Sequence, residues 1–264
     1  MNIFRREMKT HRWGLLFWSL GMVLLVMSGM AKFAAYVGAG QSVEQIMGAL
    51  PKAVQVIFGI TGFDLTKASG FYGILFLYLA VMAAVHAVLL GANVISEEER
   101  DKTSEFLYAK PVSRGKALTG KLVAGLVNLV VLNVVTLLSS FYFVSYFGKG
   151  ESVGSEILVL MAGLFFLQLI FFSIGAVVAG TARRPKSAAT RATSIMLLTF
   201  LLYYLINLDD KLGFLKYFTP FKYYDAAVLL KSGLDPVFVA ISVVIIVAAI
   251  FGTYHFYSAR DLSV

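Results

Sequence analysis

Residues 71–95 read FYGILFLYLAVMAAVHAVLLGANVI, a run of 25 residues that contains no Asp, Glu, Lys or Arg. A helix needs about 20 predominantly apolar residues to cross the hydrocarbon core of a bilayer. This run therefore predicts a membrane-spanning helix. The whole composition agrees, because charged residues make up only 14% of the chain, whereas soluble domains usually carry about 25%.

Five further apolar runs are long enough to span a membrane. The run at 13–30 follows a basic segment, as in a signal peptide, but it is longer than a typical signal core, so we expect it to be retained as a span. The fold class predicted is an all-α integral membrane protein with six transmembrane helices, forming one membrane domain over residues 1–264. The five runs are 13–30, 118–147, 156–181, 193–208 and 236–257.

Lysine and arginine are distributed unequally between the two sides of these spans. Four precede the first span, six lie between the end of the second span and Lys121 in the first turn of the third, four lie between the fourth and fifth, and one follows the sixth. The opposite side carries eight against these 15, and every arginine lies on the richer side. Because cytoplasmic connections are enriched in Lys and Arg, both termini are predicted to be cytoplasmic. The expected location is the cell membrane.

The two long connections on the outer side, 31–70 and 209–233, contain short amphipathic segments. Ser42 and Gln45 form a capping-box pattern, and Pro51 suits the first position of a further short helix. The second connection is dense in Phe and Tyr, which are typical of a membrane interface. Their apolar stretches are too short to span and are broken by Pro51 and Pro220, so we expect short external helices there.

The segment 96–121, SEEERDKTSEFLYAKPVSRGKALTGK, lies on the predicted cytoplasmic side. Ser96 and Glu99 form a second capping-box pattern, which predicts that a helix begins there. Pro111 prevents clean continuation of that helix. A short helix with Phe106 and Leu107 as apolar anchors is a good docking element, although a solvated loop that merely follows the positive-inside rule is the alternative.

This segment resembles the cytoplasmic loop of permeases of ABC type-2 transporters, which are mostly exporters. In that family an acidic cluster, a Thr, a Glu and two apolar residues precede Pro-Val-Ser-Arg and a later Gly-Lys. The matching positions here are 97–99, Thr103, Glu105, Phe106, Leu107, 111–114, Gly120 and Lys121. One position departs from the pattern, because Lys102 stands where many members have Gly before the Thr. Residues 218–223 and 257–262 also resemble the family.

The resemblance implies that the segment is a coupling helix between spans two and three, which sits in a cleft of a separate ATPase subunit. It also implies short re-entrant external helices between spans five and six. The residues expected to contact the ATPase are Glu98, Glu99, Thr103, Phe106, Leu107, Pro111, Ser113 and Arg114.

The chain is not expected to hydrolyse ATP itself. Residues 115–121, GKALTGK, match most of a phosphate-binding loop, but Leu122 stands where Ser or Thr should coordinate magnesium, and no strand precedes the motif. By the resemblance, two copies of a partner ATPase bind ATP and Mg, and a second permease subunit, identical or homologous, completes the transporter. We expect no cofactor, metal or nucleic acid on this chain, since it has no cysteine and no histidine pair with metal-ligand spacing.

Polar side chains inside the spans are candidates for the translocation path. Those singled out are His86, Asn128, Asn133 and Gln168. The alternative for each is an interhelical hydrogen bond, worth about 0.6 kcal/mol on average. The small residues Ala83, Ala87 and Gly91 form a ridge in the second span, which suits either an internal helix contact or a seam between two permeases.

Two other functions compete with an ATP-driven permease. One is an ATP-independent secondary transporter or channel, and the other is a membrane scaffold or sensor. No acidic residue lies at the centre of a span, which disfavours a proton- or sodium-coupled carrier because such carriers often need one.

Overall fold

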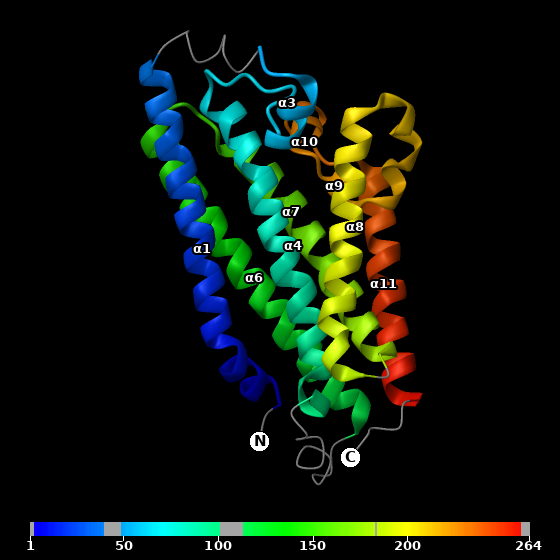
Figure 1. Ribbon diagram of the computed structural model, residues 1–264. Helices are drawn as coiled ribbons and strands as arrows, with labels where there is room; N and C mark the ends of the chain where they lie inside the picture. Colours follow the sequence, from blue (N-terminus) through cyan, green and yellow to red (C-terminus); the bar gives the residue numbers. More distant parts are fainter. Residues whose placement is uncertain (1–2, 40–48, 101–112, 183, 260–264) are drawn as a thin grey trace.

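The structure is a computed structural model that describes residues 3–39, 49–100, 113–182 and 184–259, and every regular element within these ranges is helical. Six helices are long and apolar enough to cross a membrane, which confirms the six spans predicted from the sequence (Figure 1). They are α1 (Ile3–Ala39), α4 (Ala68–Arg100), α6 (Arg114–Phe147), α7 (Gly154–Thr181), α8 (Ala188–Leu208) and α11 (Pro236–Ala259).

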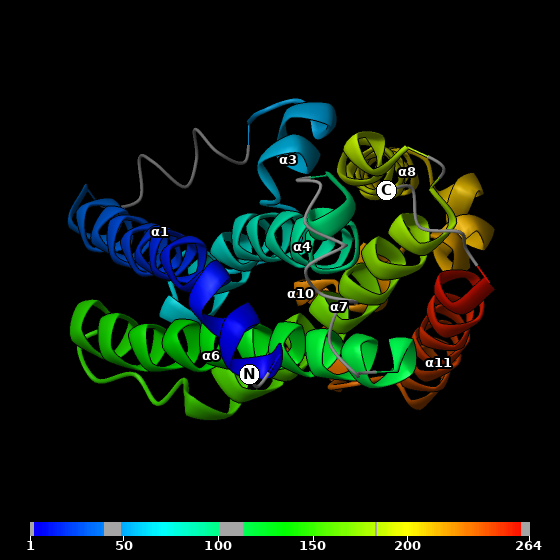
Figure 2. The ribbon, with the colours of Figure 1, turned by 90° about the horizontal axis from the view of Figure 1, so that it is seen from below.

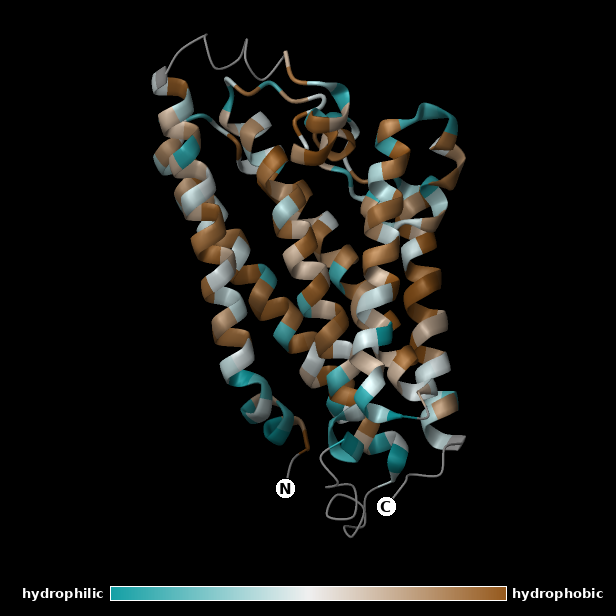
Figure 3. Ribbon diagram, viewed as in Figure 1, coloured by the Kyte–Doolittle hydropathy of each residue, from teal (hydrophilic) through white to brown (hydrophobic). Residues whose placement is uncertain are grey.

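The bundle has an apolar middle and two hydrophilic ends (Figure 3). The start of α1 and the end of α11 lie at the same end, together with the end of α4 and the start of α6 (Figure 1). Apolar residues dominate the middle of the long helices, and hydrophilic residues gather towards both ends (Figure 3). This banding is what a bilayer requires of a bundle that crosses it.

Short helices cover the other end of the bundle. They are α3 (Lys52–Phe58), η2 (Asp210–Phe218), α9 (Pro220–Tyr223) and α10 (Ala226–Ser232), and a further short helix, η1 (Pro185–Ser187), precedes α8 at the end where the termini lie. The prediction of short helices in place of additional spans is confirmed for the described residues. Pro51 stands at the start of α3 as predicted, but as its N-cap, one position before the first helical residue, whereas Ser42 and Gln45 lie outside the described residues.

Local sequence explains several of these boundaries. Ser113 precedes α6 and accepts a hydrogen bond from the backbone N–H of Lys116. Asp225 caps α10 in the same way, through the N–H of Ala227. At the end of α3, Gly59 adopts a φ of 69°, a left-handed conformation that glycine adopts without a steric cost.

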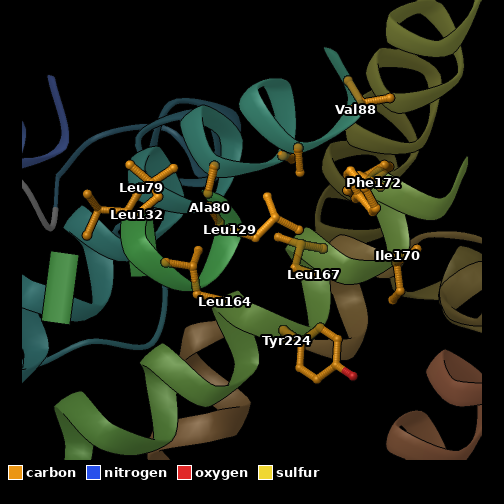
Figure 4. Packing of buried hydrophobic residues seen from close by; sticks show 14 of the residues in the cluster. Leu79, Ala80, Val88, Leu129, Leu132, Leu164, Leu167, Ile170, Phe172 and Tyr224 are labelled. Atoms are coloured by element: carbon orange, nitrogen blue, oxygen red, sulfur yellow. The ribbon is translucent and has the colours of Figure 1, made fainter. Parts of the chain in front are cut away.

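Helices α4 and α7 form the centre of the bundle. They pack more extensively against each other than any other pair, while α1 packs mainly on α6, and α11 mainly on α7 (Figure 2). Leu79, Ala80 and Val88 of α4 meet Leu129 and Leu132 of α6 and the buried apolar residues of α7 (Figure 4). These α7 residues are Leu164, Leu167, Ile170 and Phe172.

Two glycines allow the backbones of α4 and α7 to touch. A Cβ atom added to Gly91 would collide with the carbonyl oxygen of Phe172, and one added to Gly175 would collide with that of Val88. Small residues permit this close approach in membranes, where burial of apolar surface does not drive helices together. The ridge that includes Ala83, Ala87 and Gly91 is therefore an internal contact, which resolves the alternatives left open by the sequence.

The helix start predicted at Ser96 is wrong. Helix α4 continues without interruption to Arg100, and the Ser96 hydroxyl donates a hydrogen bond back to the carbonyl of Ala92, one turn earlier. A serine that bonds within its own helix does not cap a new one. The remainder of the predicted coupling helix, residues 101–112, lies outside the described residues.

Candidate functional site

An ion-pair cluster joins the start of α1, the end of α4 and the start of α6. It consists of Arg6, Glu7, Glu98 and Lys121. The Lys121 side chain is fully buried, and its Nζ donates to the carbonyl oxygen of Val94 at 2.8 Å and pairs with Glu98. Arg6 pairs with Glu98 and also donates to Glu7 Oε1 at 2.8 Å. The cluster thus ties three helices together at the end where the termini lie.

Burial changes the interpretation of two predicted coupling residues. Glu98 is 7% exposed and Glu99 is 9% exposed. Because the Glu98 carboxylate is engaged by Arg6 and Lys121 inside the bundle, it is placed to hold the helices rather than to contact another protein. A carboxylate buried at this depth requires such partners, since an unpaired buried charge is strongly destabilising.

The chain is fixed on both sides of 101–112. On one side, Arg100 donates to Asn93 Oδ1 within α4 at 3.1 Å. On the other side, Ser113 caps α6, and Arg114 donates to the carbonyl oxygen of Ser258 in α11 at 3.4 Å.

The remaining predicted coupling residues lie within this segment. Thr103, Phe106, Leu107 and Pro111 fall outside the described residues.

Two of the predicted path residues meet between α6 and α7. Asn133 Nδ2 donates to Gln168 Oε1 and to the carbonyl oxygen of Met161, each at 3.3 Å. Gln168 is completely buried, and its Nε2 has no hydrogen-bond partner among the described residues. The pair therefore links two core helices and keeps one buried donor available.

The other two path residues line a separate cavity between α1, α4 and α6. This cavity has a volume of about 160 Å³, and His11, Trp18 and Asn93 contribute to it besides His86 and Asn128. His86 is 4% exposed, lies 5.4 Å from the Trp18 ring between centroids, and has no partner for Nδ1 within the described part of the chain. The four candidates therefore form two separate pairs.

A larger pocket opens at the end covered by the short helices. It has a volume of about 460 Å³ and lies between α3, α8, η2, α9 and α10. Lys222 lines it, with Nζ donating to Asp225 Oδ2 at 2.8 Å and to Asn207 Oδ1 at 2.6 Å, and lying 5.6 Å from the centroid of the Tyr203 ring. Sequence reasoning identified the aromatic segment but did not single out this polar set, because its members come from α8 and α9 and the turn after α9.

An aromatic cavity continues from this pocket into the bundle. It shares Tyr203 and Asp225 with the pocket and adds Phe76, Phe221 and Tyr224. The Tyr224 hydroxyl lies 2.7 Å from the hydroxyl of Ser242, and burial raises the pKa of Tyr224 to about 12. The phenol therefore stays neutral at physiological pH and acts as a hydrogen-bonding group.

Comparison with known proteins identifies the family. No curated protein sequence matched the chain. A family described as ABC-2 family transporter protein matches residues 1–262, nearly the whole length. The match includes the six apolar helices and the segment 96–121 whose pattern resembles these permeases. The chain therefore belongs to the ABC-2 transporter family, as a multi-pass permease subunit of an ABC transporter.

Proposed function

We propose that this permease forms the substrate path of an ATP-driven exporter in the cell membrane and is coupled through residues 101–112 to a separate ATPase subunit. The observation that carries the proposal is the family match over residues 1–262. The arrangement at the ends of that segment supports it, because the ion-pair cluster and the Ser113 cap hold the adjoining helices. In this proposal, a force that the ATPase exerts on residues 101–112 is transmitted to the two adjoining helices, α4 and α6.

In this proposal two copies of the ATPase bind ATP and Mg, and a second permease subunit, identical or homologous, completes the complex. Substrate leaves through the external pocket beside Lys222 and Asp225. Its aromatic and charged lining suits an amphipathic molecule, since aromatic faces contact apolar groups and cations while the ion pair binds polar ones.

The proposal is tested by purifying the tagged permease from its native membrane and identifying the proteins that accompany it. We expect an ABC ATPase to copurify, and the complex in inside-out vesicles to accumulate substrate only with hydrolysable ATP. Flux that is driven by an ion gradient without ATP would contradict the proposal, and so would substrate binding without flux.

Topology gives a separate prediction, which uses the absence of native cysteines. Ser155 lies in the first turn of α7 and Lys186 lies in η1, after the end of α7, so these two exposed residues lie at opposite ends of the bundle. In intact cells, Ser155→Cys should react with a membrane-impermeant maleimide, whereas Lys186→Cys should react only after permeabilisation. This result follows from the Lys and Arg asymmetry. The reverse labelling pattern would place the termini outside.

A further inference from the structure

Three potential metal ligands converge beside the ion-pair cluster. Glu7 and His11 lie one turn apart on α1, and Glu97 comes from the end of α4. One ligand atom from each lies within 4.8 Å of the other two. The start of α1 and the end of α4 lie at the same end of the bundle (Figure 1) and are joined there by the Arg6–Glu98 ion pair, so the group forms only when the bundle is folded.

The distances suit ligands that share an ion. His11 Nε2 lies 3.7 Å from Glu7 Oε2 and 3.6 Å from Glu97 Oε2. Both distances exceed those of normal hydrogen bonds. Two ligands at tetrahedral angles around zinc, with bonds of about 2.0–2.2 Å, are separated by about 3.3–3.6 Å. Small side-chain movements would bring all three atoms to coordinating distance.

Two buried imidazole nitrogens nearby lack hydrogen-bond partners. Nε2 of His11, whose side chain is 15% exposed, has none among the described residues, and the same is true of Nδ1 of His86, which is 4% exposed. Both histidines line the 160 Å³ cavity between α1, α4 and α6. A buried polar atom without a partner is costly, and a metal ion held by the three ligands would supply a partner for His11 Nε2, whereas His86 lies three turns before Glu97 on α4.

A neighbouring side chain orients one of the ligands. Arg6 holds Oε1 of Glu7, which leaves Oε2 directed at His11. Partners that fix a ligating carboxylate in this way are typical of metal sites.

We propose that Glu7, His11 and Glu97 bind a divalent transition-metal ion of the zinc type, which fastens the start of α1 to the end of α4. The ligand set selects the metal, because imidazole suits zinc and its neighbours, whereas Mg²⁺ and Ca²⁺ prefer oxygen ligands alone. The ion would lie just before residues 101–112, but the site stands independently of any coupling function.

The test measures zinc binding to the full-length permease in nanodiscs. The protein is purified through an affinity tag that contains no histidines, and a chelator removes any bound metal beforehand. We expect one Zn²⁺ per chain by titration, and an affinity at least about tenfold weaker in His11→Ala and in the isosteric Glu97→Gln. The matched control is His255→Ala, since His255 is an exposed histidine of α11, and it should bind zinc normally. Absence of binding to the wild type, or equal binding by all variants, would overturn the proposal.

Two measurements on the wild type keep the test valid if a variant fails to fold. Zinc should raise the melting temperature of the wild type, because a ligand that binds only the folded state stabilises it. Co²⁺ in place of zinc should give the strong visible absorption of a four-coordinate site that includes nitrogen. If His11 is instead simply protonated between the two carboxylates, zinc leaves the melting temperature unchanged and the proposal fails.

Discussion

Replacing both Phe106 and Leu107 with Asp is expected to abolish association of the permease with its ATPase. Apolar anchors at the centre of an interface commonly contribute about 2 kcal/mol or more each, and two carboxylates in their place would have to be desolvated without partners. Insertion into the membrane should be unaffected, because neither residue lies in one of the six apolar runs of the sequence. The measurement is copurification of the ATPase together with ATP-dependent transport.

The control for this variant is Arg114→Ala. Arg114 is exposed and its hydrogen bond to the carbonyl of Ser258 is long, so its loss should weaken transport only mildly, as expected for a charge at the rim of an interface. If the double variant assembles with the ATPase and transports at the normal rate, residues 101–112 do not couple the two subunits.

Lys121→Met is expected to lower the stability of the permease by about 3–5 kcal/mol, the cost of removing one partner from a buried ion pair. Lys121 is fully buried, and its loss removes one of the two cationic partners of the Glu98 carboxylate. The measurement is the midpoint of unfolding in mild detergent, supported by the yield of monodisperse protein.

A matched control is available one turn earlier in α6. Lys116 is exposed, so Lys116→Met should change stability little. The combination of Lys121→Met with Glu98→Gln should recover part of the loss, because a neutral amide is less costly to bury than an unpaired carboxylate. Equal stability of the two single variants would show that the buried pair does not hold α4 to α6.

The spans were predictable because a bilayer imposes a requirement that each segment meets by itself. Residues 71–95 are apolar along their whole length, and no partner is needed to recognise them. The same holds for Pro51, the residue before the first turn of α3, because proline suits the start of a helix wherever that helix packs. Such features depend only on local sequence.

The ion-pair cluster and the proposed metal ligands could not be predicted in this way. The pattern at Ser96 and Glu99 is locally that of a cap, but α4 continues because Glu98 finds Arg6 and Lys121 within the bundle. Glu7 and Glu97 lie 90 positions apart in the sequence, and only folding brings them to the same imidazole. A search for histidine pairs alone misses such a mixed set of ligands.

The close backbone contacts that Gly91 and Gly175 allow between α4 and α7 determine which parts of the bundle remain free to rearrange. Helices that meet through side chains can slide as rotamers change, but helices that meet backbone to backbone have no flexible layer between them. Helices α4 and α7 should therefore move together as one rigid unit. Any opening and closing during a transport cycle then falls to the peripheral helices α8 and α11, which turn most of their apolar surface outwards and are not tied by the ion-pair cluster.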